Sequence, residues 1–279
     1  MVVVDNGSTD GTAEMMREKY SDFTLMEMDA NVGFGRALDL AIGQYGDGPI
    51  LLLNNDVVLE EGFVAEMTAT AAGGSPMVAG VLTRSDEPGI IDSAGVIADS
   101  RTLMAFDSLE GAPIEAVLNA GPPLGPTGGA GLYDRTAFNQ AGGFDPRIFA
   151  YYEDLDLALR MRLDGCRCVL APRARGSHMR SSTLGARSAS KYALTGWSRG
   201  YLLRRYGIMD SLPRLVRTVV YDGCVCAGQI VMDHTFSGLR GRFRGWQAAG
   251  SLEKRPLPAS GLSRISVRAA IRARIKRYL

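Results

Sequence analysis

Short apolar runs alternate with amphipathic stretches over the first 83 residues. The apolar runs are expected to be strands, at 2–5, 23–28, 50–53 and 77–83. The stretches between them have helical periodicity, near 10–19, 33–45 and 60–72. Thr9 or Asp10 would cap the first of these helices. Strands that alternate with helices predict an α/β fold with a mostly parallel sheet and helices on both faces.

The pattern changes after residue 83. Residues 90–106 are expected to form a β-hairpin around Ala94-Gly95 or Asp99-Ser100, and the Gly- and Pro-rich residues 107–131 a loop. That loop either covers a ligand or is a plain surface connection.

A third region begins with an expected helix at 153–164. A strand at 166–170 and an extended segment to His178 follow it. Beyond residue 185 the pattern is helical. We therefore expect a catalytic domain at 1–184, a helical C-terminal extension at 185–250, and a linker with a basic amphipathic helix at 251–279.

Charge is distributed unevenly, although the net charge is only +1. Residues 1–172 carry 10 Lys/Arg and 26 Asp/Glu, whereas residues 173–279 carry 21 and 4. The basic half predicts an anionic partner. No nucleic-acid-binding motif accompanies the charge, which favours a membrane surface or a lipid diphosphate over nucleic acid.

The last sixteen residues resemble a membrane-surface helix. Residues 264–279 hold six Lys/Arg and no acid, and one apolar stripe recurs every four residues: Val267, Ile271, Ile275 and Leu279. We expect this stripe to enter an anionic membrane interface, with Arg268, Arg272, Arg274, Lys276 and Arg277 beside the headgroups. The alternative is a helix that is solvated or packed against the protein.

Composition otherwise fits a globular protein. Apolar residues make up 46% of the chain, and no run of about 18 consecutive apolar residues exists, which argues against a transmembrane helix. No signal peptide is visible at the N-terminus. The cysteine pairs Cys166/Cys168 and Cys224/Cys226 are expected to be small core residues, with a zinc site as the alternative.

Acidic residues follow two of the predicted strands and open one helix. Asp5 ends the strand at 2–5, Asp56 closes Asn54-Asn55-Asp56 after the strand at 50–53, and Glu153-Asp154 opens the helix at 153–164. The carboxyl edge of the sheet is where open α/β folds hold ligands. These acids therefore suggest a site that holds a nucleotide and a metal ion and removes a proton. Asp156 and Arg160 are expected to pair along the helix.

Five motifs together resemble family 2 glycosyltransferases with the GT-A fold, nearest to the bacterial rhamnosyltransferase-like branch. They share their order and spacing with that family: VVVDNGSTDGT (2–12), NVGFGRALDLAI (31–42), LLLNNDVVLEEGF (51–63), GGAGLYDRTAFNQAGGFDPRIFAYYEDLDLALRMRLDG (128–165) and the weaker GARSASKYALTGWSRGYLLRRYG (185–207). The resemblance implies a Rossmann-like GT-A domain, here with a helical basic C-terminal region.

The resemblance also implies a metal site. Asp56 stands at the second position of the family's D-x-D motif, with Asn54 in place of the first Asp, and would bind Mg²⁺ or Mn²⁺ together with the donor diphosphate. His178 would complete the metal shell. The alternatives are a polar turn after a strand for Asn54-Asn55-Asp56 and a surface or packed residue for His178.

The remaining site residues are assigned by the same resemblance. Asp154 matches the catalytic base and would stay ionised at a helix N-terminus, with Glu153 and Tyr152 on the acceptor side. The residues expected near the nucleotide are Asp5, at the N3–H of uracil or thymine, and Gly33, Arg36 and Asn54. The alternative for Glu153-Asp154 is a pair of acids that complement the helix dipole.

The family's fold opens with one strand and helix before the motif at 2–12, so the resemblance implies that this first βα unit is missing. The strands at 2–5 and 50–53 would then each lack a neighbour. The leading hypothesis is an inverting, metal-dependent glycosyltransferase. It would move a sugar from a dTDP- or UDP-sugar to a glycan or polyprenyl-linked acceptor. The branch that the motifs resemble suggests rhamnose as this sugar. That activity serves cell-envelope polysaccharide synthesis on the cytoplasmic face of the plasma membrane. The alternative is a non-catalytic remnant that acts as a binding module.

Overall fold

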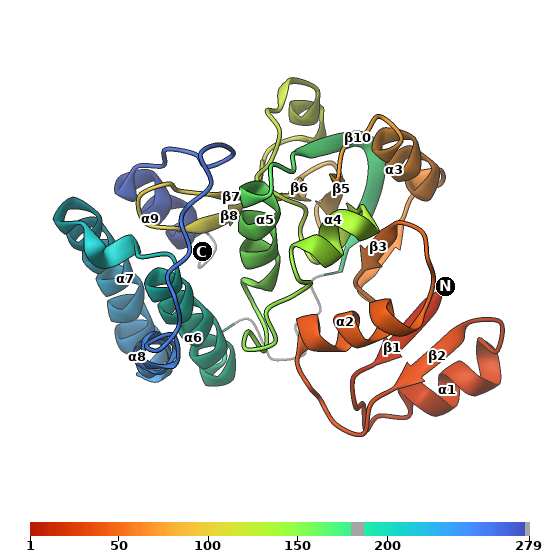
Figure 1. Cartoon of the computed structure of the whole chain (residues 1–279), viewed down its shortest axis with the longest axis horizontal. Coiled ribbons are helices and arrows are strands. Elements are labelled where there is room, and N and C mark those ends of the chain that lie inside the picture. The colour runs from red at the N-terminus through yellow and green to blue at the C-terminus, as the bar shows by residue number, and fades with distance from the viewer. Residues whose placement is uncertain (180–186, 277–279) are drawn as a thin grey trace.

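The computed structural model describes residues 1–179 and 187–276, and the side chains up to residue 272 (Figure 1). Its strands are β1 (Val2–Asp5), β2 (Thr24–Glu27), β3 (Ile50–Leu53), β4 (Val57–Leu59), β5 (Met77–Arg84), β6 (Ile91–Ser93), β7 (Val96–Ala98), β8 (Ala105–Asp107), β9 (Ala130–Tyr133) and β10 (Cys168–His178). Its helices are α1 (Thr12–Lys19), α2 (Phe34–Gln44), α3 (Phe63–Ala71), η1 (Ile114–Asn119), α4 (Arg135–Gln140), α5 (Glu153–Leu163), α6 (Ala189–Arg205), η2 (Ile208–Asp210), α7 (Leu212–Asp233), α8 (Ser237–Ala248) and α9 (Val267–Lys276).

The central sheet has the strand order β3-β9-β5-β10-β4, with β6 paired to β5. Strands β3, β5 and β10 run in one direction, because β3 and β5 are both antiparallel to β9 and β10 is parallel to β5. Strands β4 and β6 are antiparallel additions. The predicted α/β class and the helical C-terminal region are confirmed.

Strands β1 and β2 form a parallel pair of their own. Among the described strands, none lies hydrogen-bonded between β1 and β3, in keeping with the expectation that each has an open edge. The first helix begins at Thr12, two residues later than expected, and its N-cap is Gly11 rather than Thr9 or Asp10. The left-handed backbone of Gly11 delays the helix, while Asp10 Oδ1 accepts the Thr12 N–H at 3.2 Å.

Helices cover both faces of the central sheet because the apolar side chains along its strands point alternately to one face and to the other. On one face Phe63 and Met67 of α3 pack against Val78 and Leu82 of β5. On the other face side chains of α2, α4 and α5 pack against the strands, around Met77, Ala79, Phe138, Leu157 and Met161.

Helix α5 lies between the sheet and a helical layer. Its far side packs Leu155 and Leu159 against Tyr201 and Leu202 of α6. The predicted pair is present, with Arg160 Nε donating to Asp156 Oδ2 at 2.8 Å, and Tyr206 Oη donates to Asp156 Oδ1 at 2.9 Å. These buried bonds fix the helix that carries Glu153 and Asp154 at its start.

The middle of the chain holds more regular structure than the sequence predicted. The expected hairpin is β7–β8 and turns after Asp99, whereas Ala94-Gly95 only links β6 to β7. The expected loop at 107–131 contains η1 and runs directly into β9, which inserts between β3 and β5. Strand β4 and helix α4 were also not expected.

The C-terminal segments wrap the helical layer. Residues 251–262 have no helix or strand, as expected, and Leu252, Leu257 and Leu262 pack onto the core between α5 and α6. The expected domain boundary between residues 184 and 185 lies outside the described residues.

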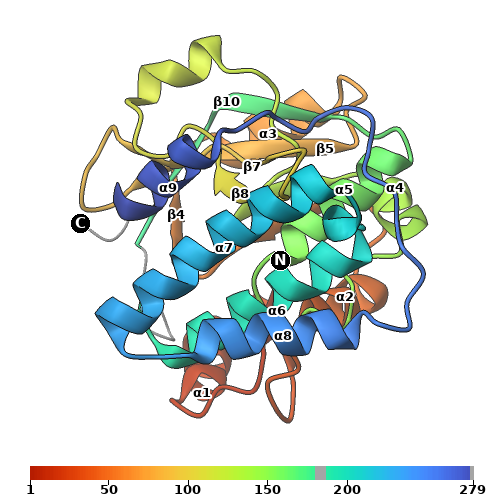
Figure 2. The ribbon, with the colours of Figure 1, turned by 90° about the vertical axis from the view of Figure 1, so that its left-hand side faces the viewer.

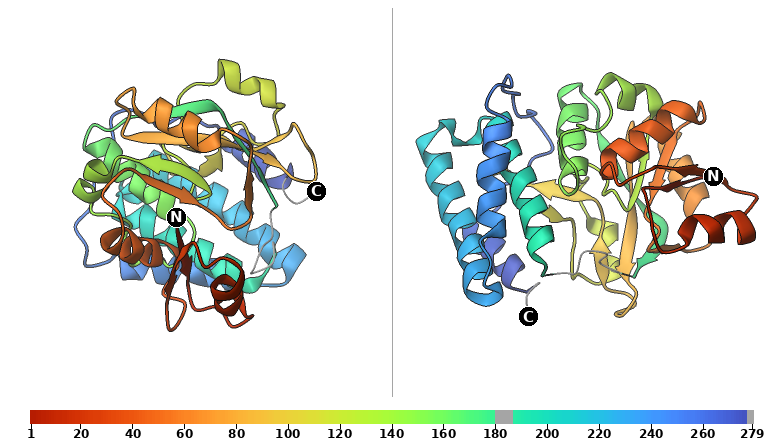
Figure 3. Two further views of the ribbon diagram at one scale, coloured as in Figure 1. Left: turned by 90° about the vertical axis from the view of Figure 1, so that its right-hand side faces the viewer. Right: turned by 90° about the horizontal axis from the view of Figure 1, so that it is seen from below.

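Helices α6 and α8 approach unusually closely through glycine. A Cβ built on Gly200 would lie 1.9 Å from Arg242 O, and one on Gly245 would lie 1.8 Å from Trp197 O. Such distances put backbone against backbone, the arrangement that small residues spaced along two helices allow. The closely packed α6–α8 pair lies behind α5, with α6 between α8 and α5 (Figure 3).

Replacement of Gly245 by Ala is expected to lower the free energy of unfolding by about 1–3 kcal/mol or more, because neither backbone can yield to the added methyl. Gly228 in α7 has nothing within 4 Å of a built Cβ. There the same change is expected to be neutral or to stabilise by up to about 1 kcal/mol. Urea titrations of the two variants measure the difference; equal midpoints would show that the close approach is not rigid.

Candidate active site

The polar triplet Asn54-Asn55-Asp56 lies between the end of β3 and the start of β4. The Asn54 N–H donates to Gly129 O at 3.3 Å, and the Met179 N–H donates to Asp56 O at 2.8 Å. The triplet is therefore held between the loop before β9 and the end of β10. This position agrees with the expected carboxyl edge of the sheet.

Asp56, His178 and Asp92 form one linked group from three separate elements. His178 is the last residue of β10, and its Nε2 lies 3.2 Å from Asp56 Oδ2. Its Nδ1 donates to Asp92 Oδ2 of β6 at 2.6 Å. The hydrogen bond to Asp92 raises the pKa of His178 above its ordinary value, against the opposing effect of burial. Asp92 thereby fixes the ring so that Nε2 faces Asp56.

The residues at this group suit a hard divalent cation. Asp56 Oδ1 is buried and has no hydrogen-bond partner among the described residues, so one carboxylate oxygen is left for another ligand. Within the described ranges, no group of three or more His, Cys, Asp or Glu side chains is arranged so that it could hold a metal ion by itself, and the cysteines there are free. An ion held here would need further oxygen ligands, which substrate phosphates commonly supply to Mg²⁺.

Glu153 and Asp154 occupy the first turn of α5, as predicted. Tyr151 and Tyr152, just before them, both have φ of 68°. This left-handed backbone costs roughly 1–2 kcal/mol per non-glycine residue, and such strain occurs at functional sites. Asp154 Oδ2 accepts the Gly128 N–H at 3.3 Å.

Burial raises the pKa values of both carboxyl groups, and that of Glu153 more than that of Asp154. It raises the pKa of Glu153 to about 8, reinforced by the neighbouring charge of Asp154. Burial also raises the pKa of Asp154 to about 6, while hydrogen bonds from backbone N–H groups hold it down. The helix N-terminus does not lower the pKa of Asp154 below its ordinary value, because burial outweighs it. Burial therefore makes Glu153 the harder of the two acids to ionise, a division suited to acid–base chemistry.

The Gly128-Gly129 turn connects the two acidic groups. Gly129 O accepts from Asn54 and the Gly128 N–H donates to Asp154, so β3 and α5 meet across this turn. A Cβ on Gly128 would lie 3.2 Å from the Phe34 ring. The end of the 107–131 loop therefore lies between the candidate residues of β3 and α5.

Asp5 lies at the end of β1 and is buried. Its Oδ1 accepts the Ser8 N–H at 3.0 Å, which closes the turn after the strand. Asn6, which the sequence did not single out, accepts from the Val32 N–H at 2.9 Å and joins this turn to the start of α2.

The start of α2 is packed against the loop before α5. The Phe34 N–H donates to Phe149 O at 2.8 Å, and a Cβ on Gly33, whose φ is 95°, would lie 2.7 Å from that oxygen. Gly33 therefore permits a close backbone contact. Arg36 is exposed and has no hydrogen-bond or ion-pair partner among the described residues.

The structure thus unites part of the predicted site. Asp56 meets His178 directly, and Asn54 reaches Asp154 through Gly129 and Gly128. Within the described ranges, no hydrogen bond or ion pair joins Asp5 or Arg36 to these residues. Tyr152 packs against the core between α5 and α6, while Lys191 lies 5.5 Å above the Tyr151 ring.

Sequence reasoning missed Asp92, Asn6 and the Gly128-Gly129 turn. Asp92, like Asp56, is an acidic residue that follows a short apolar run, here two isoleucines, so the same pattern could have identified it. Its partner lies 86 residues away along the chain, a separation that only the sheet brings together.

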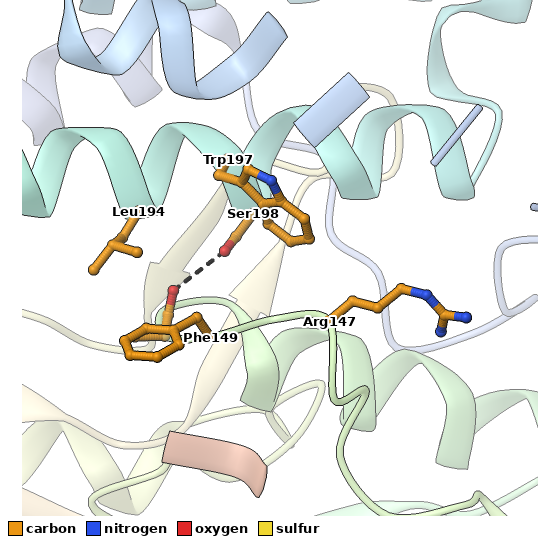
Figure 4. A pocket seen from close by; sticks show the side chains of 6 residues that line it. Arg147, Phe149, Leu194, Trp197 and Ser198 are labelled. Carbon is orange, nitrogen blue, oxygen red and sulfur yellow. Dashed lines mark hydrogen bonds between the residues drawn. The ribbon is translucent and has the colours of Figure 1, made fainter. Parts of the chain in front are cut away.

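A pocket of about 200 Å³ adjoins the loop before α5 (Figure 4). Phe149 and Ala150 line it from the loop, and Leu194, Trp197 and Ser198 line it from α6. Ser198 Oγ donates to Ala150 O at 3.2 Å. The pocket gives α6 an apolar and aromatic surface next to Tyr151.

Comparison with protein families matches residues 1–109 to the model "Glycosyl transferase family 2". The chain is 31% identical over 224 residues to the N-acetylglucosaminyl-diphospho-decaprenol L-rhamnosyltransferases of two Mycobacterium tuberculosis strains, CDC 1551 / Oshkosh and ATCC 25618 / H37Rv. These matches cover 69% of this chain and 70% of each relative.

Among solved structures, the chain resembles GalNAc-T7, crystallised with UDP, GalNAc and Mn²⁺. The TM-score is 0.57 at 12% sequence identity, and the match covers 90% of this chain and 49% of that one. At this identity the likeness concerns the fold, and this chain spans about half of GalNAc-T7.

Proposed function

Since this chain belongs to glycosyl transferase family 2 and is a glycosyltransferase, we propose that it is an inverting enzyme assisted by a divalent cation. In this proposal it moves a sugar from a nucleotide-diphosphate donor to a glycan or polyprenyl-linked acceptor. The observation that carries the proposal is the placement of Glu153 and Asp154 at the start of α5, which Gly128 and Gly129 tie to Asn54 beside Asp56.

Asp154 is the proposed general base. An inverting transfer needs one carboxylate to take the acceptor hydroxyl proton as the sugar's anomeric carbon gains oxocarbenium character. The Gly128 N–H orients Oδ2 of Asp154 and supports its ionised form. Neutral Glu153 can donate a hydrogen bond to the acceptor, since its Oε2 is buried with no partner among the described residues.

Asp56 and His178 are the proposed ligands of Mg²⁺ or Mn²⁺. When bound, the cation would neutralise charge that develops on the leaving diphosphate. Asp92 holds the His178 ring, and the Met179 N–H fixes the backbone of Asp56.

The donor is proposed to be a dTDP- or UDP-sugar. Asp5 would accept the N3–H of the base, with Gly33, Arg36 and Asn54 near the ribose and phosphates. Exposed Arg36 is available for a phosphate. The name of the mycobacterial relatives suggests rhamnose as the sugar and a polyprenyl diphosphate as the acceptor carrier. We place the reaction in cell-envelope polysaccharide synthesis, on the cytoplasmic face of the plasma membrane.

Transfer assays with the purified chain test the proposal. The chain is incubated with Mn²⁺, a polyprenyl-diphospho-N-acetylglucosamine acceptor and either dTDP-rhamnose or a UDP-hexose, and both nucleoside diphosphate and glycolipid product are measured. Equal amounts of the two products support the proposal. Donor binding without turnover would instead support the binding-module alternative.

The rate is expected to depend on pH as a bell between about pH 6 and pH 8. Asp154 must lose its proton, so kcat/KM rises as pH increases through about 6. Glu153 must keep its proton, so kcat/KM falls as pH increases through about 8. In Glu153→Gln the amide cannot ionise, so the alkaline fall should disappear and the acid limb should stay. A Gln variant that keeps the alkaline fall would remove Glu153 from that role.

A further inference from the structure

The outward face of α7 is mostly apolar. Leu212, Val216, Val219, Val220 and Val231 point away from the protein and are 49–72% exposed. The positions between them on that face are Gly223, Cys224 and Ala227, which are also exposed. A solvated helix normally carries polar residues on this face.

The turn after α7 and the start of α8 extend this surface. Phe236, Leu239 and Phe243 are 48–62% exposed. Helices α7 and α8 form the outermost layer of the molecule, at the left of Figure 1 and toward the viewer in Figure 2. Several exposed apolar side chains on neighbouring outer helices mark an interaction site.

The charges on this surface are all positive. Arg217, Arg240 and Arg244 are exposed and have no ion-pair partner among the described residues. The acids of α7 are occupied elsewhere, since Asp222 pairs with Arg199 and Arg242, and Asp233 pairs with Arg187. Apolar side chains with free arginines beside them suit an anionic lipid surface.

The predicted membrane helix at the C-terminus is not available for that role. In α9, Ala270 is fully buried, and Val267 and Ile271 pack against Met104, Tyr221 and Val225. The stripe thus faces the protein as far as the structure describes it; the side chain of Ile275 and residue Leu279 lie outside the described residues. The expectation of a membrane-inserted tail is wrong for Val267 and Ile271, because α7 and β7–β8 offer them an apolar surface.

By length and composition alone, helix α7 could cross a membrane, and 33% of its most apolar stretch is buried. Its inner face, however, carries the ion pairs of Asp222 with Arg199 and Arg242. Crossing the bilayer would break these pairs and expose a carboxylate to lipid. Lying on the surface keeps them and covers only the outward face.

We propose that the α7–α8 surface, defined by Leu212, Val216, Val220, Val231, Phe236 and Phe243, docks on an anionic lipid leaflet. Its use in delivering a lipid-linked acceptor rests on the proposed function. The end of α7 lies near the site: Asp233 accepts from Arg187 Nε and from Tyr192 Oη, each at 2.7 Å, and Lys191 of the same helix turn lies over Tyr151. An acceptor anchored beside α7 is therefore close to the loop that precedes Glu153 and Asp154.

Vesicle co-sedimentation tests the docking surface. The whole chain is mixed with phosphatidylcholine vesicles with and without phosphatidylglycerol, at low and high salt. Val231→Glu and Phe243→Glu are expected to lower partitioning onto anionic vesicles at least about tenfold, since each loses apolar contact and adds a like charge. Replacing Arg217, Arg240 and Arg244 by Gln should lower it about fivefold per arginine.

Leu118→Glu is the matched control. Leu118 on η1 is as exposed as Val231, at 72%, so both variants are expected to melt like the wild type. Leu118→Glu should bind vesicles normally. The proposal would be overturned if Val231→Glu bound anionic vesicles as well as the wild type does, or if the wild type did not bind them. A wild-type dimer that Val231→Glu converts to monomer with vesicle binding unchanged would also overturn it, because the surface would then bind a second copy.

Transfer assays with a soluble acceptor that carries a short lipid tail distinguish a failure of the docking surface from a failure of the proposed function. Val231→Glu should transfer sugar to that acceptor at the wild-type rate. If the wild type docks on vesicles but transfers to neither acceptor, the proposed function fails and the docking surface stands.

Discussion

Asp154→Asn is expected to reduce sugar transfer by about 10²–10⁴-fold, the usual contribution of a general base. The amide keeps the size of the side chain and an oxygen for the Gly128 N–H, but it cannot take a proton. Nucleotide affinity should change little, since Asp154 is proposed to touch the acceptor. Steady-state transfer rates and calorimetric titration with the nucleoside diphosphate measure the two effects separately.

The control is Asp164→Asn, an exposed acid at the other end of the same helix. Its rate should equal that of the wild type. Asp154→Asn activity above about a tenth of the wild-type rate would exclude Asp154 as the base. A parallel loss of nucleotide binding would place Asp154 on the donor side.

Asp56→Ala is expected to remove the metal dependence of donor binding. The wild type should bind the nucleotide sugar more tightly with Mn²⁺ than without it. The variant should have one weak affinity in both conditions, at least about 10–100-fold below the wild type with Mn²⁺ because a direct ligand is lost. Calorimetry with and without Mn²⁺ gives both values, and binding of Mn²⁺ alone gives a readout independent of transfer.

Asp86→Ala provides the comparison, because Asp86 is an exposed acid just after β5. It should keep the metal dependence. Equal donor affinity of the wild type with and without Mn²⁺ would show that the metal assignment is wrong.

Much of the fold follows from local sequence pattern. Alternation of apolar strands with amphipathic helices located β1, β2, β3 and β5, and α1 to α3, within a few residues. Strand β9 was missed because Ala130-Gly131 lies in a Gly- and Pro-rich stretch that has the composition of a loop. Its pairing with β3 and β5 is long-range and leaves no local signal.

The site was predicted where an acid directly follows a strand or opens a helix, as at Asp56 and Asp154. The contact of His178 with Asp92, and the bond of Gly128 to Asp154, depend on the sheet bringing distant segments together. The sequence around Glu153 and Asp154 does not show that the two side chains are buried. It therefore predicted that the helix N-terminus keeps Asp154 ionised. In the structure, burial raises the pKa values of both acids.

The C-terminal region shows a different limit. An apolar stripe among arginines has the same pattern whether it faces lipid or protein, so Val267 and Ile271 did not reveal their partner. On α7 the exposed apolar side chains are interrupted by buried Tyr221, Asp222 and Gln229, so no uninterrupted apolar run marked the helix.

The anomeric configuration of the transferred sugar tests the central claim most directly. The purified chain, a nucleotide sugar and the lipid-linked acceptor are incubated with Mn²⁺, and the product is examined by NMR. A single base at Asp154 predicts one glycoside whose configuration is inverted relative to the donor, formed at least about 100-fold more slowly by Asp154→Asn. A product with retained configuration, or nucleoside diphosphate released without any glycoside, would contradict the account.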